Sequence, residues 1–288
     1  MNYVYIYIGE IPDYIKYSIN AVLSVEKNAA VYFCTDQDVD FPGCTMVSLK
    51  ELESDDIKYI KSSNLYSGTT YESNPLWITS LLRLFYLDKI AVLYNLNTFI
   101  HFDADILIYE PYEKIQHLFK KNKINITQLT KNQLIFGYCY IDNSEKYSIV
   151  VKNVLKVIKD IDYYKKLNFG EPLNEMEILG IVFNEHHNLF NLIPTLPYGD
   201  EGYVFDPASY GQYFGGTHQN PRKFFSARIK EQHHIVGNEI MAKRIKPVLM
   251  KKQPRVLYNT KSSKIINLHI HSKKLYKYLP VQYKDYIK

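Results

Sequence analysis

The first 35 residues combine two short apolar runs with a segment of helical periodicity between them. Residues 3–8 and 30–34 are rich in aromatic and β-branched side chains, as buried strands are. Residues 13–27 place apolar side chains near the spacing of one helix face. A strand, a helix and a strand at this spacing require parallel pairing of the two strands. The sequence therefore predicts an α/β fold with a ligand site at the strand ends.

The rest of the chain continues the alternation of helices and strands. Asn74-Pro75 begins an expected helix that runs to Leu87, since proline is tolerated in a first turn. Other expected helices lie near 112–121, 145–160 and 173–187, and expected strands near 45–49, 99–102, 106–109, 133–140 and 191–193. Residues 50–72 are expected to be irregular. The Gly- and Tyr-rich stretch 197–221 is expected to be a long functional loop.

Composition indicates a globular protein with a full core, because 46% of residues are apolar and 23% are charged. The three cysteines form no metal-spaced pair, which favours a reducing compartment. The N-terminus lacks a basic n-region and no segment approaches membrane-spanning length. We therefore expect a cytoplasmic protein without a signal peptide.

The net charge of +5 is distributed unevenly along the chain. Residues 221–288 contain 17 Lys and Arg against 3 Asp and Glu, which favours an anionic partner such as a phosphate or an anionic lipid. Peripheral contact with a membrane surface is one expectation, and a solvated lysine-rich surface is the alternative. No nucleic-acid partner is expected, because no recognisable binding motif is present.

Asp103-Ala104-Asp105 stands between two apolar runs, 99–102 and 106–109. Carboxylates between apolar strands are costly unless they are paired or bound to a cation. Two such groups at a strand end direct hard oxygen ligands to one point, as a divalent cation carrying a phosphate group requires. The alternative is a charged turn in a hairpin.

Two other segments carry polar groups within apolar patterns. Arg83 lies inside the apolar series of the helix that begins at Pro75, where a snorkelling surface arginine is the alternative to a functional one. Residues 264–274 alternate, with Asn267, His269 and His271 on one face. Two histidines beside Ser and Lys could serve a metal and a phosphate, whereas a half-exposed edge strand is the alternative.

Taken together, these motifs resemble the GT-A glycosyltransferases, and most closely the glycogenin and lipopolysaccharide-galactosyltransferase family. Four landmarks occur in the family's order, and they are the helix start at Asp13-Tyr14-Ile15 after the first strand, Leu82-Arg83-Leu84-Phe85, the Asp-x-Asp motif at Asp103-Ala104-Asp105, and His269-Ile270-His271-Ser272-Lys273-Lys274. The resemblance covers residues 1–195 loosely and then the final strand.

The chain departs from the family's pattern at three places, and one of them is the stretch from Asp206 to His218, which has no counterpart in the family. The family's His-x-x-Gly-x-x-Lys-Pro-Trp becomes His269-x-x-Ser272 without Pro-Trp, and register favours His269 over His271 as the metal ligand. The acceptor-side Asp-Gln-Asp is replaced by Asn174-Glu175-Met176-Glu177.

The resemblance implies a GT-A fold in one domain, residues 1–288, with a mixed central sheet flanked by helices. Residues 1–110 would form a Rossmann-like nucleotide-binding half, 111–260 a smaller acceptor-side lobe, and 261–288 the C-terminal strand and basic tail.

The resemblance also implies transfer of a sugar from a nucleotide-diphosphate donor, by preference a uridine nucleotide, to a glycan or glycolipid acceptor, with retention of configuration. Mn²⁺ or Mg²⁺ would be bound by Asp103, Asp105 and His269. The implied donor-side residues are Tyr7, Ile8, Gly9, Asp36, Arg83, Asp103, Ala104, Asp105, His271, Lys273 and Lys274.

Glu175 is the first candidate for acceptor-side chemistry, followed by Asp200, Glu177 and Asp206, because an inverting enzyme needs a carboxylate base. Two other functions compete with the transferase. One is a phosphohydrolase or phosphotransferase with an Asp-x-Asp nucleophile, and the other is a non-catalytic relative that binds a nucleotide-sugar.

Overall fold

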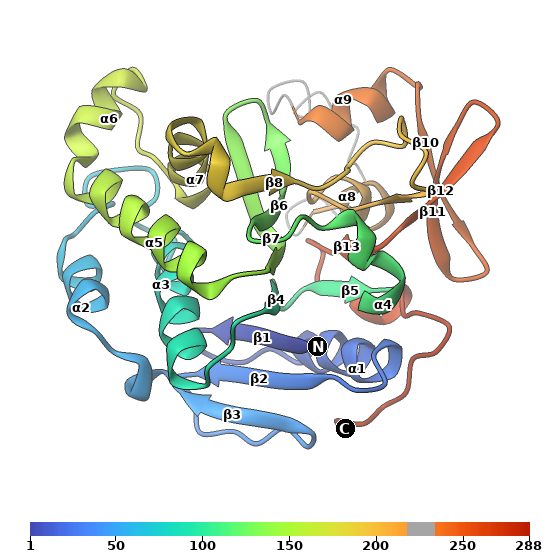
Figure 1. Cartoon of the computed structure of the whole chain (residues 1–288), viewed down its shortest axis with the longest axis horizontal. Helices are drawn as coiled ribbons and strands as arrows, with labels where there is room; N and C mark the ends of the chain where they lie inside the picture. Colours follow the sequence, from blue (N-terminus) through green and yellow to red (C-terminus); the bar gives the residue numbers. More distant parts are fainter. Residues whose placement is uncertain (218–233) are drawn as a thin grey trace.

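The structure is a computed structural model, and the residues that it describes are 1–217 and 234–288. A mixed seven-stranded sheet in the order β3-β2-β1-β4-β7-β6-β8 forms its centre, with helices on both faces (Figure 1). The predicted fold class, an α/β protein with a mixed central sheet flanked by helices, is confirmed.

The N-terminal half of the sheet is parallel. Strand β1 (Asn2–Tyr7) pairs with β2 (Ala30–Thr35), and β2 with β3 (Cys44–Ser48). Helix α1 (Tyr14–Val25) makes the predicted connection between β1 and β2. On its other side β1 pairs in parallel with β4 (Phe99–Phe102). The carboxyl ends of β1, β2 and β4 therefore lie at the same edge of the sheet.

Side chains of β1 alternate between two cores, as the pleat of a strand requires. Val4 and Ile6 belong to the larger core, while Tyr3 and Tyr5 pack with α1 on the other face. Four helices contribute to the larger core, namely α2 (Asp55–Ser62), α3 (Leu76–Leu93), α5 (Ser144–Lys159) and α7 (Glu175–Glu185). The parallel half of the sheet is thus covered on both faces.

The other half of the sheet is built on a hairpin that the sequence patterns predict only in part. Strand β7 (Gln133–Ile141) pairs antiparallel with both β4 and β6 (Ile124–Thr130), and β6 pairs in parallel with β8 (Phe190–Leu192). Strands β7 and β8 are predicted, whereas β6 is not. The alternation of Ile124 and Ile126 with polar residues is a signal of a half-buried strand.

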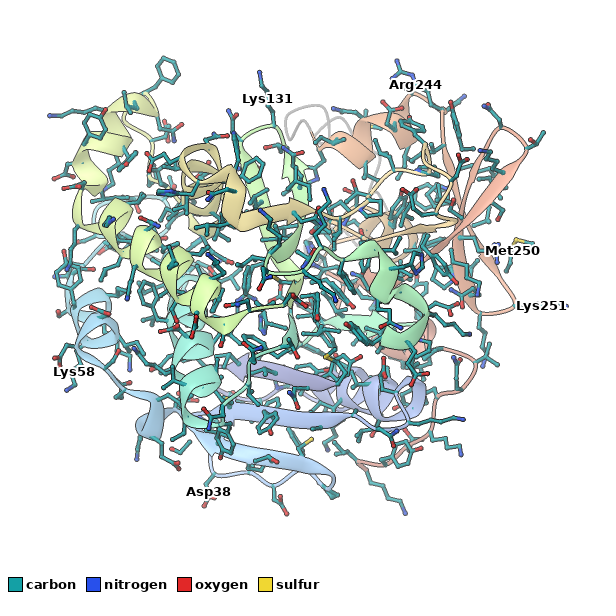
Figure 2. All side chains as sticks on the ribbon, in the orientation of Figure 1. Asp38, Lys58, Lys131, Arg244, Met250 and Lys251 are labelled. Carbon is teal, nitrogen blue, oxygen red and sulfur yellow. The ribbon has the colours of Figure 1, made fainter. Side chains whose placement is uncertain are left out.

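A second, four-stranded sheet lies at the opposite end of the molecule from α6 (Ile161–Leu167) (Figure 1). It has the order β10-β11-β12-β9, where β10 is Lys246–Met250, β11 is Gln253–Tyr258, β12 is Lys261–Ile265 and β9 is Tyr203–Val204. Only the end of β12 is predicted from the sequence. Met250 and Lys251 extend from the tip of the β10–β11 hairpin (Figure 2).

The strand expected over residues 264–271 is divided into two. β12 ends at Ile265 in the four-stranded sheet, and β13 (Asn267–His269) pairs antiparallel with β5 (Ile106–Ile108). The polar face of β13 is not exposed, because Asn267 and His269 are both buried. The alternative of a half-exposed edge strand is therefore wrong.

Two expectations about local structure are corrected. Residues 50–72 are not wholly irregular, because a 3₁₀ turn (Leu49–Leu52) and α2 occupy much of that range, with the Ser54 hydroxyl accepting from the Ile57 amide at the start of α2. Serine before two aspartates is a helix-start signal. The helix near 112–121 is shorter than expected, because α4 (Tyr112–Ile115) passes into a 3₁₀ turn (Gln116–Leu118).

The expected loop 197–221 contains β9 and a short helix, α8 (Tyr210–Gly215), and its residues 218–221 lie outside the described ranges. The basic C-terminal quarter also falls partly outside them, at 221–233, before α9 (Ile235–Met241). Among the helices of residues 1–217 and 234–288, none has the length and apolar character needed to cross a bilayer. Cytoplasmic location and peripheral membrane contact stay predictions.

Gly180 in α7 provides a test of how this helix seats on the hairpin. A Cβ at this position would lie 2.0 Å from the Asn132 carbonyl oxygen in the β6–β7 turn. Alanine normally stabilises a helix interior, but here the clash should outweigh that gain. We expect Gly180→Ala to lower the free energy of unfolding by about 1–3 kcal/mol in urea titrations. Asn184→Ala, an exposed change on the same helix, should leave it nearly unchanged.

Candidate functional site

The Asp-x-Asp motif forms the turn between β4 and β5, which belong to different sheets. The Asp103 amide donates to the Gly137 carbonyl at 2.9 Å, and the Asp103 carbonyl accepts from Ile106 at 3.1 Å. Asp105 is only 3% exposed, so its carboxylate requires charged or polar partners. The alternative of a charged hairpin turn is wrong.

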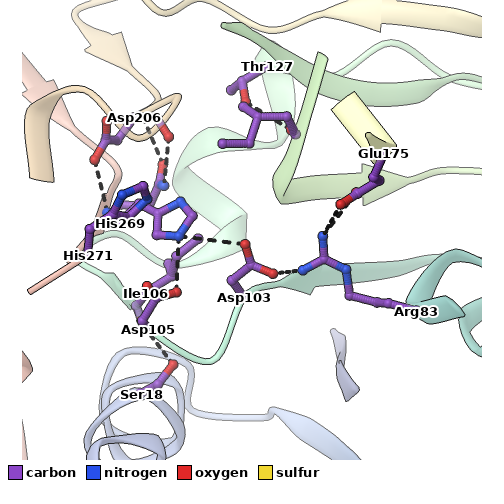
Figure 3. Close-up of polar contacts among 12 residues, drawn as sticks. Ser18, Arg83, Asp103, Asp105, Ile106, Thr127, Glu175, Asp206, His269 and His271 are labelled. Carbon is purple, nitrogen blue, oxygen red and sulfur yellow. Dashed lines mark hydrogen bonds and ion pairs between the residues drawn. The ribbon is translucent and has the colours of Figure 1, made fainter. Parts of the chain in front are cut away.

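Strand β13 brings His269 directly to these carboxylates. His269 stands opposite Ile106 in the β5–β13 register, and the Ile270 amide donates to the Asp105 carbonyl at 2.9 Å. His269 Nε2 lies 3.0 Å from Asp105 Oδ1 and 3.6 Å from Asp103 Oδ2 (Figure 3). These three side chains, of which His269 lies far from the motif in sequence, therefore converge on one point.

Gly137 on β7 leaves room for this cluster. A Cβ at Gly137 would lie 3.0 Å from His269 Nδ1 and 3.6 Å from Asp103 Oδ2. The first distance is closer than ordinary packing allows, so a larger residue would displace the imidazole. Gly137 is absent from the residues predicted for the site, although a glycine inside an apolar strand often indicates a close approach.

Arg83 lies between two carboxylates (Figure 3), and only 11% of its side chain is exposed. Its Nη1 pairs with Asp103 Oδ1, and its Nη2 donates to both Glu175 oxygens at 3.0 Å. A guanidinium is suited to such bridging because its donors form a rigid fork. Burial raises the pKa of Glu175, and the charge of Arg83 opposes that rise. The alternative of a snorkelling surface arginine is wrong.

Lys273 borders the cluster on the side of α1. Its Nζ pairs with Asp105 Oδ2 and lies 5.3 Å from the centroid of the Tyr14 ring. Burial alone would raise the pKa of Asp105, but His269 and Lys273 outweigh it and hold that pKa well below its ordinary value. Asp105 is therefore ionised, as a metal ligand must be. Lys274, by contrast, is exposed.

The ends of β1 and β2 meet beside this edge. The Gly9 amide donates to Asp36 Oδ1 at 2.9 Å, with Gly9 in the left-handed region at φ +99°. Although burial raises the pKa of Asp36, hydrogen bonds from Gly9 and Gln37 lower it overall. Tyr7 forms a hydrogen bond with Tyr14. The pKa of Tyr14 is raised, and the largest cause is the burial of its side chain.

The remaining predicted donor-side residues lie near these contacts. Ile8 is partly buried against the larger core, and Ala104 is partly buried against the core on the α1 face. The Gly9–Asp36 hydrogen bond joins the ends of β1 and β2. The series Tyr7–Tyr14–Lys273 connects the end of β1 with the Asp-x-Asp turn.

Asp206, a candidate for acceptor-side chemistry, accepts hydrogen bonds from backbone amides of two different elements. Its two oxygens accept from the amides of Tyr210 and Gly211, each at 2.7 Å, and of His269 at 2.9 Å. Asp206 thereby joins the start of α8 to β13. Burial raises the pKa of Asp206, while the three amide donors lower it.

The other acidic candidates lie in structural contacts. Glu177 accepts from the Asn174 amide at 2.9 Å and completes a capping box at the start of α7. Asparagine followed by glutamate three positions later is a sequence signal for such a cap. Asp200 is exposed and pairs with Lys261 on β12 at 2.5 Å, so the structure places it apart from the Asp-x-Asp cluster.

His271 is predicted on the donor side, and it lies beside the predicted metal ligands. Within residues 1–217 and 234–288, one group of histidine, cysteine or acidic side chains lies close enough together to hold an ion. Its members are Asp105, His269 and His271. Burial lowers the pKa of His271 well below its ordinary value, so its imidazole is neutral, the form that binds metals.

The sequence matches no protein-family model, and no curated protein matches it. The solved structures that are similar to it include glycosyltransferases. Mouse xyloside xylosyltransferase 1 shares 11% identity over 67% of this chain and 86% of its own, with a TM-score of 0.47. An active-site mutant of LgtC shares 11% identity over 81% of this chain and 83% of its own, with a TM-score of 0.43.

The glycosyltransferase GlyE of Streptococcus pneumoniae TIGR4 shares 11% identity over 80% of this chain, with a TM-score of 0.44. The match spans only 50% of the GlyE chain.

The role of Asp206 can be tested by Asp206→Asn. The asparagine side chain would place its NH₂ group opposite at least one backbone N–H donor. Two donors cannot hydrogen-bond to each other, so a buried hydrogen bond is lost. We expect the free energy of unfolding to fall by roughly 1–3 kcal/mol in urea titrations. Asp200→Asn, at an exposed position, is the matched control. Equal stability of the two variants would contradict the structural role.

Proposed function

We propose that this chain is a metal-dependent glycosyltransferase that uses a nucleotide-diphosphate sugar, most simply a UDP-sugar. One observation carries the proposal, and it is the convergence of Asp103, Asp105, His269 and Lys273 at one edge of the parallel strands. Acidic and imidazole ligands next to a lysine charge suit an ion that carries a diphosphate.

The donor set supports Mn²⁺ or Mg²⁺. Asp105, Asp103 Oδ2 and His269 Nε2 would hold the ion, because their atoms face one another and His269 Nε2 lies near both carboxylates. A bound divalent cation supplies positive charge to the departing diphosphate. Lys273 would add its own charge there, since its Nζ already borders Asp105.

The donor's base and ribose would lie along Tyr7, Ile8, Gly9 and Asp36. Loops at the carboxyl ends of parallel strands are the usual nucleotide site of such sheets. Support for this placement comes from the contact of Asp36 with the Gly9 amide and from the Tyr7–Tyr14–Lys273 series, which leads to the ion site. Retention of configuration and a glycan or glycolipid acceptor are parts of the proposal that rest on the motif resemblance.

The phosphohydrolase alternative fits the geometry less well. An Asp-x-Asp nucleophile needs a carboxylate oxygen that can attack phosphorus. Asp103 Oδ1 is paired with Arg83, and both oxygens of Asp105 are paired with His269 and Lys273. These contacts favour ligand roles over nucleophilic ones.

Metal dependence and turnover can be tested together by measuring UDP release from a panel of UDP-sugars. We expect release with Mn²⁺, loss of release with EDTA, and a fall of about 10²-fold or more in Asp105→Ala, because charge compensation is lost at the leaving group. Asp38 is an exposed aspartate far from the motif in sequence (Figure 2). The control variant Asp38→Ala should therefore retain full activity.

Two outcomes would overturn the proposal in different ways. Release of UDP that is unaffected by EDTA and by Asp105→Ala would exclude a metal-dependent transferase. Thermal stabilisation by UDP and Mn²⁺ without turnover of any sugar would instead support the binding relative.

Glu175 would act by positioning Arg83 rather than as a base, since both its oxygens accept from Arg83. In Glu175→Gln the guanidinium loses one of its two anionic partners and should draw Asp103 away from the ion. We expect the Mn²⁺ concentration for half-maximal activity to rise severalfold, with the rate recovering at saturating Mn²⁺. A rate that stays low at every Mn²⁺ concentration would indicate a catalytic base instead.

A further inference from the structure

We propose that His271 is a second imidazole ligand of the ion, held in place by Gln212 of α8. The inference rests on the proposed function only in requiring that a divalent cation binds at this site. It extends the set that the motif resemblance implies, which contains one histidine and the two aspartates.

The geometry of the three side chains carries the proposal. One ligand atom each from Asp105, His269 and His271 lies within 4.8 Å of the other two. Zinc binds imidazole nitrogen at about 2.0–2.1 Å, and at metal–ligand distances of this order ligand atoms up to about 4 Å apart share one ion after small side-chain movements. The two rings stand nearly perpendicular, at 79°, with centroids 4.3 Å apart (Figure 3).

Asp103 lies farther from His269 than Asp105 does. Its Oδ1 is engaged by Arg83, and its Oδ2 lies 3.6 Å from His269 Nε2, compared with 3.0 Å for Asp105 Oδ1. Asp103 therefore lies at the edge of the cluster, and His271 supplies a further ligand.

Gln212 determines which ring nitrogen of His271 faces the ion. The amide nitrogen of Gln212, Nε2, lies 2.8 Å from His271 Nδ1, which leaves His271 Nε2 as the ligand atom. Rotation of the amide by 180° places its oxygen beside Nδ1 instead, so that Nδ1 carries the proton and Nε2 keeps its lone pair for the ion. Hydrogen bonding to the other ring nitrogen is how proteins orient metal-binding histidines.

The buried Asp206 explains how Gln212 reaches this position. Asp206 binds the amides of Tyr210 and Gly211 at the start of α8 and the amide of His269 in β13. A Cβ at Gly211 would lie 2.1 Å from the His269 carbonyl oxygen, so α8 packs directly on β13. The same contact that fixes His269 therefore fixes the helix that orients His271.

Two imidazoles alter the expected ion preference. Imidazole favours later transition metals, whereas carboxylate and water ligands suit Mg²⁺. We expect Mn²⁺, and more strongly Co²⁺, to bind the chain more tightly than Mg²⁺ does.

Calorimetric titration of the full chain with Mn²⁺, without nucleotide, tests the ligand set apart from activity. We expect affinity to fall about tenfold or more in His271→Ala and about tenfold in Gln212→Leu. Gln212→Glu should bind at least as tightly as the unaltered chain, because a carboxylate accepts the Nδ1 proton. His187→Ala, at an exposed histidine outside the cluster, should bind normally, and circular dichroism checks that each variant is folded.

Nitrogen couplings in the electron paramagnetic resonance spectrum of bound Mn²⁺ give a second readout. Two coupled imidazoles in the unaltered chain and one in His271→Ala would support the proposal. One imidazole in both, with unchanged affinity, would overturn it and leave the proposed function standing. Two-imidazole binding without UDP release from any donor would support this inference and overturn the transferase. Absence of Mn²⁺ and Co²⁺ binding would overturn both.

Discussion

The pairing of β5 with β13 is the interaction on which the candidate site depends. β5 follows the Asp-x-Asp turn directly, and β13 comes near the end of the chain, so their register sets where His269 stands. A shift of one residue would turn Leu268 or Ile270 toward Asp105 and would direct His269 elsewhere. Because Leu268 and Ile270 are fully buried, the apolar core strongly opposes such a shift.

Charge balance is the second constraint on this site. Asp103, Asp105 and Glu175 are gathered with the cations Arg83 and Lys273, and most of these groups are shielded from water. Each carboxylate has at least one cationic neighbour, which reduces the cost of burial. Arg83 pairs with Asp103 and Lys273 with Asp105, so the acidic ligands are oriented before any ion arrives.

Sequence patterns predicted the elements that have strong local signals and missed those that lack them. The β1–α1–β2 unit, α3 and the strands around Asp103 have continuous apolar runs or helical periodicity. The strands β6, β10 and β11 are of mixed polarity, and they are stabilised by pairing with their neighbours. The capping box at Asn174 and Glu177 is readable from its spacing, although the prediction of that helix did not use it.

The sequence alone determined the chemistry available, namely an Asp-x-Asp turn between apolar strands, an arginine within an apolar helix, and two histidines near the C-terminus. Only the tertiary structure decided which other acidic side chains lie beside these groups. Glu175 lies against Arg83, whereas Asp206 and Glu177 hold backbone amides and Asp200 lies exposed on Lys261. The physical reason is that strand register and helix docking, and not local spacing, bring distant side chains into contact.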